Sequence, residues 1–133
     1  MKIGFRDMIA AADAAVETVP AQQALKRHED ESVVFVDIRD VRELERDGMI
    51  PGAFHCPRGM LEFWAHPESP YHKPLFAQDK TFVLYCASSW RSALSTKALK
   101  DMGMENVAHI GGGFTAWKEA GGAVGEKPAK KPK

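Results

Sequence analysis

The chain has 133 residues, of which 44% are hydrophobic and 27% are charged, and its formal net charge at pH 7 is zero. This length suits one domain with one hydrophobic core, and the composition is that of an ordinary soluble globular protein. A net charge of zero gives no electrostatic reason to expect a nucleic acid or an anionic membrane as partner.

Nothing in the sequence predicts a membrane span or an export signal. No apolar run approaches the ~20 residues that a spanning helix needs. Residues 1–16 mix two basic and two acidic side chains with their apolar ones, unlike a secretory signal peptide. Cys56 and Cys86 are therefore expected to be free thiols in the reducing cytoplasm.

Helical and strand patterns alternate along the first part of the chain. Apolar residues at helical spacing predict an amphipathic helix over residues 4–15. A short strand is expected at 17–19, followed by a helix over 20–28. The β-branched apolar run at 32–38 predicts a strand that is buried on both faces.

Short elements are expected next: a helix capped by Asp40 and ended by Gly48, a turn and strand within 50–56, a helix at 59–66 and a proline-rich loop at 67–74. A second buried strand is predicted at 81–86, then a helix at 91–103, a strand at 106–110 and a helix at 113–121. In the 91–103 helix, the residues expected to face inward are Ala93, Leu94, Ala98, Leu99 and Met102. Strands that alternate with helices predict an α/β fold with a mainly parallel sheet.

Cys86 stands where a strand ends and a helix begins, which is where ligands of parallel sheets bind. Loop amides, the helix N-terminus and the permanent charge of Arg91 would all favour a thiolate there. Three serines surround it in the run CASSWRS. This setting suits a nucleophilic cysteine that handles an anionic group, whereas a structural cysteine would need only apolar neighbours.

Two motifs in this sequence resemble the rhodanese family of sulfurtransferases in its single-domain form. FVDIRDVRELERDGMIPGAFHCP (35–57) resembles the family's strand–helix–turn signature. VLYCASSWRSALSTKALKDMGMENVAHIGGGFTAWKEAG (83–121) resembles its active loop and closing Gly-Gly-Phe-x-Ala-Trp element. The resemblance implies a three-layer α/β domain over 16–121, a mainly parallel sheet flanked by helices. A separate amphipathic helix (1–15) precedes it, and a disordered basic tail (122–133) follows.

The resemblance also implies an enzyme that moves a sulfane sulfur from thiosulfate or a persulfide donor to a thiol or cyanide acceptor, or to a protein partner in a sulfur relay. Cys86 would carry the persulfide, and Arg91 would bind the anionic donor. Asp37 would be a buried carboxylate that holds neighbouring loops. No cofactor and no metal are expected. The residues expected to hold the sulfur or the donor are Ala87, Ser88, Ser89, Trp90, Ser92 and Arg58.

The sequence departs from the family pattern at two positions. Met49 stands where the family often has His, just before Ile-Pro-Gly-Ala, and Ser89 stands where related loops commonly carry Gly. If that loop position needs a positive φ, Ser89 is strained. The segment 59–80 is longer than the family minimum and could form one wall of the site or simply pack in the core; its candidate residues, with the neighbouring Arg58, are Phe63, Trp64 and Tyr71.

Two interpretations of Cys56 are possible. It could be a resolving thiol that forms a disulfide with Cys86, or a thiol that is held away from Cys86. The second is favoured, because a resolving thiol would discharge the persulfide. No histidine lies next to the Cys86 loop in the sequence, and the scattered histidines lack metal-ligand spacing. The glycine run 111–113 predicts a turn and close packing, and Trp117 is expected in the core.

Two rival functions remain open. Cysteine phosphatases and arsenate reductases use Cys-x-x-x-x-x-Arg loops, whereas four residues separate Cys86 from Arg91 here, and the smaller loop suits a single sulfur atom better. The other rival is an interaction module that relays sulfur between proteins, which the retained Cys86 and Arg91 do not distinguish from a small-molecule enzyme.

Overall fold

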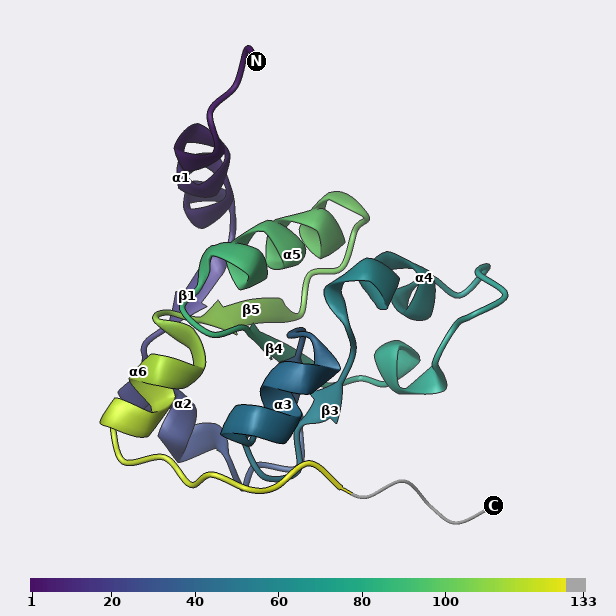
Figure 1. Cartoon of the computed structure of the whole chain (residues 1–133). Helices are drawn as coiled ribbons and strands as arrows, with labels where there is room; N and C mark the ends of the chain where they lie inside the picture. The colour runs from purple at the N-terminus through teal and green to yellow at the C-terminus, as the bar shows by residue number, and fades with distance from the viewer. Residues whose placement is uncertain (129–133) are drawn as a thin grey trace.

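The computed structural model describes residues 1–128 and contains a five-stranded parallel sheet in the order β1-β5-β4-β2-β3 (Figure 1). The strands are β1 (Glu17–Val19), β2 (Val33–Asp37), β3 (Phe54–His55), β4 (Thr81–Tyr85) and β5 (Val107–Ile110). The predicted α/β fold with a mainly parallel sheet is confirmed.

Helices cover both faces of this sheet. They are α1 (Phe5–Ala15), α2 (Ala21–Arg27), α3 (Val41–Asp47), α4 (Leu61–Ala65), α5 (Trp90–Asp101) and α6 (Gly113–Glu119), with 3-10 turns η1 (Arg58–Met60) and η2 (Pro74–Ala77). Within residues 1–128, no helix is long and apolar enough to cross a membrane.

Two core clusters lie on opposite faces of the sheet. One joins Leu84 of β4 to Leu61 of α4 and Leu99 of α5. The other joins Tyr85 of β4 to Trp117 of α6. Because side chains alternate along a strand, consecutive residues of β4 feed the two clusters. The central strands are thus buried on both faces, as their continuous apolar runs predict.

Local chemistry explains how α3 begins and ends. The Asp40 carboxylate accepts a hydrogen bond from the Arg42 amide at 2.9 Å, and the Asp40 amide donates to the Glu43 carboxylate at 2.9 Å. This reciprocal pair satisfies amides that the first helical turn leaves free. Gly48 ends the helix with φ of 80°. The arrangement fixes Glu43 near the carboxyl end of the sheet.

The structure differs from the sequence expectation in two helices. The helix predicted at 59–66 is split into η1 and α4. Met102, expected to face inward, is 42% exposed because α5 ends at Asp101 and the chain turns at Gly103, where φ is 105°. The buried face of α5 includes the hydroxyl-bearing Ser92, Ser95 and Thr96.

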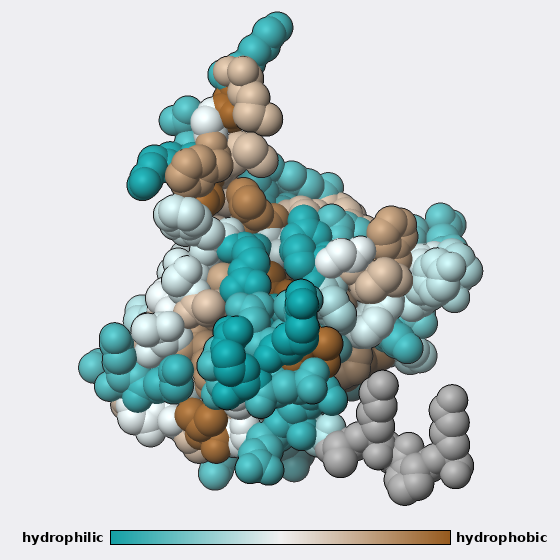
Figure 2. Space-filling view, in the orientation of Figure 1, coloured by the Kyte–Doolittle hydropathy of each residue, from teal (hydrophilic) through white to brown (hydrophobic). Residues whose placement is uncertain are grey.

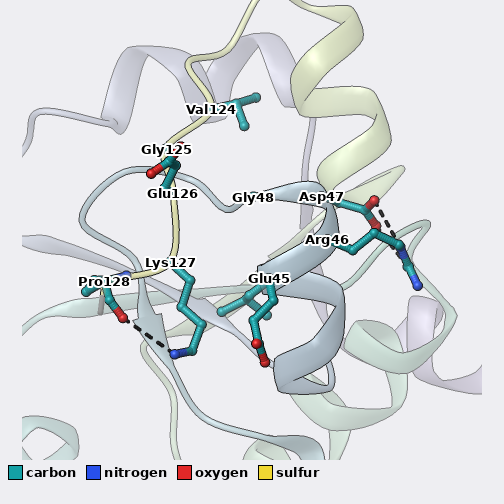
Figure 3. A pocket seen from close by; sticks show the side chains of 10 residues that line it. Glu45, Arg46, Asp47, Gly48, Val124, Gly125, Glu126, Lys127 and Pro128 are labelled. Carbon is teal, nitrogen blue, oxygen red and sulfur yellow. Dashed lines mark hydrogen bonds and ion pairs between the residues drawn. The ribbon is translucent and has the colours of Figure 1, made fainter. Parts of the chain in front are cut away.

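The segment after α6 also differs from the predicted tail, of which 129–133 lie outside the described residues. Gly125 exchanges two backbone hydrogen bonds with Met49, at 2.8 and 2.9 Å, and the Trp117 indole donates to the Ala123 carbonyl. These hydrogen bonds hold in place a glycine-rich segment whose composition alone predicts disorder. A groove of about 520 Å³ lies between this segment and the end of α3, with Glu45 and Lys127 in its lining (Figure 3).

Candidate functional site

Cys86 lies at the carboxyl end of β4, buried to 1% exposure and free of any disulfide. The first turn of α6 holds the loop that follows it: the Phe114 amide donates to the Cys86 carbonyl at 2.8 Å, and the Thr115 amide donates to the Ala87 carbonyl at 3.1 Å. Gly113 makes this approach feasible, because its φ is 60° and a Cβ there would lie 2.5 Å from the Cys86 oxygen. The glycine run thus serves turning and close packing.

Ser89 is, among residues 1–128, the only non-glycine residue with a positive φ, at 141° with ψ of −15°. The condition for strain at this loop position is therefore met. Glycine adopts such a conformation at little cost, whereas a residue with a Cβ is destabilised by it. The Ser89 carbonyl accepts from the Ser92 hydroxyl at 3.2 Å and from the Ala93 amide at 2.9 Å. Ser88 and Ala87 complete the loop without such strain.

Arg91, at the start of α5, is paired with Glu43 of α3. Its two terminal nitrogens donate to the two carboxylate oxygens at 2.8 and 2.9 Å. The Arg91 hydrogen bonds hold the pKa of Glu43 below its usual value. A polar groove of about 540 Å³ adjoins the pair, and hydrophilic residues dominate the surface over α3 (Figure 2). Its lining residues are Asp40, Arg42, Glu43, Arg46 and Arg91.

Asp37 is fully buried and bonds to Arg39, whose side chain is 1% exposed. Arg39 donates from Nη2 to the Asp37 carboxylate and to the Gly48 carbonyl, both at 2.7 Å, and its guanidinium lies 4.5 Å from the Phe114 ring centroid. Through its bond to Arg39, Asp37 is therefore linked to the Gly48 carbonyl at the end of α3 and to the Phe114 ring at the start of α6. No role was predicted for Arg39 from the sequence, although it lies in the Asp-Ile-Arg run.

Cys56 lies in the same core cluster as Cys86 and is fully buried. Burial raises the pKa of the Cys56 thiol to about 12, with the Glu62 charge adding to the effect. A thiol in this state contributes almost no thiolate near neutral pH. Nearby, Arg58 is partly exposed and donates to Glu62 at 2.7 Å.

The aromatic residues of the 59–80 segment do not form one wall. Trp64 packs against Phe54, with ring centroids 5.9 Å apart, and the Lys73 ammonium lies 4.9 Å from its ring. Phe63 and Tyr71 are 54% and 60% exposed. Trp64 therefore belongs to the core, whereas the other two rings lie on the surface.

His109 lies beside the loop in space, which sequence reasoning did not find. In the parallel register, β5 pairs His109 with Leu84, two residues before Cys86. Its Nδ1 lies 2.9 Å from the Ser92 hydroxyl oxygen, which in turn lies 3.6 Å from the Cys86 sulfur. Burial lowers the pKa of His109. Within residues 1–128, no group of three His, Cys, Asp or Glu side chains is placed to hold a metal.

Trp90 is half exposed and faces the N-terminal helix. Its ring centroid lies 5.1 Å from that of Phe5, and the Arg6 guanidinium lies within 6 Å of both rings. Helix α1 therefore packs against the beginning of α5, next to the Cys86 loop (Figure 1).

Of the predicted site residues, Ser92 and Arg91 lie around Cys86, whereas Arg58 forms an ion pair with Glu62.

Comparison with known families decides the classification. The Rhodanese-like domain family matches residues 20–120. The chain belongs to this family. The uncharacterized protein slr1261 of Synechocystis is 33% identical over 104 residues, covering 78% of this chain. YrkF of Bacillus subtilis, described as a sulfur carrier, is 30% identical over 88 residues, covering 66% of this chain. The chain spans only 53% and 43% of the length of these two relatives.

Two solved structures extend the rhodanese comparison over nearly the whole chain. A Rhodopseudomonas palustris protein of unknown function, for which tyrosine phosphatase activity has been suggested, is 52% identical with a TM-score of 0.90, covering 93% of this chain and 96% of that one. The polysulfide-sulfur transferase homodimer of Wolinella succinogenes is 27% identical with a TM-score of 0.68, covering 92% and 88%.

Proposed function

We propose that this protein is a sulfurtransferase in which Cys86 carries a sulfane sulfur from thiosulfate or a persulfide to a thiol or cyanide acceptor. The observation that carries the proposal is a free cysteine at the carboxyl end of β4, followed by four residues and Arg91, in a rhodanese-like domain. The relatives described as a sulfur carrier and a polysulfide-sulfur transferase support the same chemistry.

The reaction divides into two displacements at sulfur. The Cys86 thiolate attacks the outer sulfur of thiosulfate, so that a sulfur–sulfur bond forms at Cys86 and sulfite leaves with the electron pair of the broken bond. An acceptor thiolate or cyanide then attacks the outer sulfur of the Cys86 persulfide. That bond breaks, the acceptor keeps the sulfur, and the Cys86 thiolate is restored without an external oxidant or reductant.

The loop and α5 supply the binding groups for this sulfur. The amides from Ala87 to Ser92 would hold the outer sulfur, since loop amides and the positive end of a twelve-residue helix favour negative charge there. Arg91 would bind the anionic donor by exchanging the Glu43 carboxylate for it, because both anions suit the same guanidinium fork. Arg58 would contribute a second positive charge only on leaving its ion pair with Glu62.

A phosphatase is the second candidate, because the Rhodopseudomonas palustris relative carries that suggestion. The Cys86–Arg91 loop is one residue shorter than the Cys-x-x-x-x-x-Arg loops that hold a tetrahedral oxyanion. A shorter ring of amides suits one sulfur atom better than phosphate. We therefore rank sulfur transfer first, with the acceptor either a small nucleophile or a protein in a sulfur relay.

Parallel assays of one preparation separate these candidates. We expect turnover of thiosulfate and cyanide to thiocyanate, little hydrolysis of p-nitrophenyl phosphate, and loss of the first activity in Cys86→Ser, since a serine hydroxyl is a far weaker nucleophile toward sulfur. Phosphate release comparable to sulfur transfer would reverse the ranking. Thiocyanate formation that survives in a verified Cys86→Ser protein would exclude Cys86 as the sulfur carrier.

A further inference from the structure

A chain of polar contacts runs from the Cys86 sulfur to the N-terminal helix. The sulfur lies 3.6 Å from the Ser92 Oγ, and that oxygen lies 2.9 Å from the His109 Nδ1. On the far side of the ring, the His109 Nε2 lies 3.2 Å from the Thr18 Oγ1 and 3.6 Å from the Asp13 Oδ1. Side chains from three other elements, α5, β1 and α1, therefore meet at the buried imidazole of β5.

The relay requires the His109 tautomer with its proton on Nε2, and the partners are compatible with it. A carboxylate only accepts, so a proton on Nε2 faces Asp13, and Nδ1 is left as an acceptor. The Ser92 hydroxyl has one proton, which rotates from the Ser89 carbonyl at 3.2 Å to the closer Nδ1 at 2.9 Å. The Ser92 oxygen can then accept from the Cys86 thiol. Burial lowers the pKa of His109, so the resting ring is neutral, and the nearby Asp13 charge opposes that effect when the ring takes a proton.

We propose that Ser92, His109 and Asp13 form a proton relay for Cys86: His109 takes the thiol proton through Ser92, and Asp13 of α1 stabilises the imidazolium that results. The inference rests on Cys86 as the nucleophile of the proposed function. Ser92 contacts the reacting sulfur, whereas His109 and Asp13 act through it as positioning residues.

The proton transfer balances within the protein. The Cys86 S–H bond breaks and its proton joins the Ser92 oxygen, while the Ser92 proton moves to the His109 Nδ1. The products are a Cys86 thiolate and a His109 imidazolium whose Nε2 proton faces Asp13. The state is a coupled pair, so its titration midpoints belong to both groups together.

The surroundings of His109 contain few other charges. Helix α1 contributes Asp13, β1 contributes the hydroxyl of Thr18, and the end of β4 contributes Cys86. Helix α5 contributes Ser92 and carries Arg91, whose guanidinium is paired with Glu43. Asp13 is therefore the group that offsets a positive His109, opposing the effect of burial on its pKa.

The relay gives α1 a role that the family match does not include. That match begins at residue 20, whereas Asp13 and Thr18 precede it. Asp13 directly follows the buried Ala12 on α1, and its own side chain is 51% exposed. A substitution at Asp13 can thus remove the distal charge without opening the core.

The test measures thiolate directly and needs no sulfur donor. The ultraviolet absorbance of the thiolate would be titrated in a Cys56→Ala background from about pH 5 to about pH 10, with the matched Cys86→Ser protein subtracted at each point. His109→Gln and Ser92→Ala should each move the midpoint upward by about one pH unit or more. Asp13→Asn should move it upward by less, and Asp7→Asn, an exposed acid on the same helix, should not move it.

The double variant distinguishes a relay from two local effects. If Ser92 and His109 act in series, Ser92→Ala with His109→Gln shifts the midpoint no further than one substitution alone. Additive shifts, or an unchanged midpoint in His109→Gln, would overturn the relay. If His109→Gln does not fold, Asp13→Asn and its Asp7→Asn control decide the same question: equal midpoints in those two proteins contradict it.

The experiments distinguish a failure of the relay from a failure of the proposed function. A protein that takes sulfur from thiosulfate but shows no midpoint shifts keeps the proposed function without the relay. A protein that shows the shifts but takes up no sulfur keeps the relay and loses the proposed function.

Discussion

Ser89, three residues after Cys86, holds a backbone conformation that is costly for any residue with a Cβ. No described side-chain hydrogen bond offsets that cost, because its contacts to Ser92 and Ala93 use the carbonyl. We expect Ser89→Gly to raise the free energy of unfolding by about 1 kcal/mol, measured by urea denaturation. Ser88→Gly is the matched control, and it should give no gain because Ser88 lacks the positive φ. Equal effects of the two substitutions would show that Ser89 is not strained.

Cys56 is the second thiol of the chain, and the proposed Cys86 persulfide would be lost if Cys56 attacked it. Its pKa of about 12 and its complete burial argue against attack on Cys86. Cys56→Ala should therefore form the Cys86 persulfide in a single turnover at close to the wild-type rate, with about 1 kcal/mol of stability lost from the core. Peptide mapping without reductant, after mild peroxide, is the check. A Cys56–Cys86 linked peptide in good yield, with activity restored by reductant, would make Cys56 a redox switch.

Helices α3 and α5 are joined by the Glu43–Arg91 ion pair, which lines the polar groove beside α3. Because pairing lowers the pKa of Glu43 below its usual 4.5, the carboxylate stays charged at neutral pH, and the tie contributes stability that is lost as the pH falls through that lowered value. The same tie occupies the guanidinium that would bind the donor.

Substitutions on the two helices should therefore change donor binding in opposite directions. Arg91→Ala should raise the KM for thiosulfate roughly tenfold or more, and Arg91→Lys should raise it less, since a point charge remains without the fork. Glu43→Gln should lower the KM, because it releases Arg91. Steady-state kinetics at fixed ionic strength measure all three. Wild-type kinetics in every variant would mean that Arg91 only fastens α5 to α3.

For the whole molecule, patterns local in the sequence predicted most of the fold. The Asp40 cap, the buried strands and the Gly113 approach follow from neighbouring residues, and the structure shows each of them. The His109–Ser92 contact could not be predicted in this way, since it depends on the register of β5 against β4. The backbone pairing of Gly125 with Met49 was missed for the same reason: a partner distant in the sequence holds a segment whose composition favours disorder.

The arrangement of α1, the sheet and the Cys86 loop also shows why site residues were harder to predict than elements. His109 contacts Ser92 on another element, and Arg39 joins its near neighbour Asp37 to the Gly48 carbonyl and the Phe114 ring, so these contacts depend on the assembled fold. Arg91 was expected to bind an anionic donor, and only the assembled α3–α5 pair shows that its guanidinium is bonded to Glu43.

The central claim is that Cys86 accepts a sulfur atom, and intact mass spectrometry after incubation with thiosulfate tests it most directly. The expected result is a gain of one sulfur atom that reductant removes, mapped to the peptide with Cys86, present in Cys56→Ala and absent in Cys86→Ser. An unchanged mass in the folded wild-type protein, or a sulfur that maps to Cys56, would contradict the account.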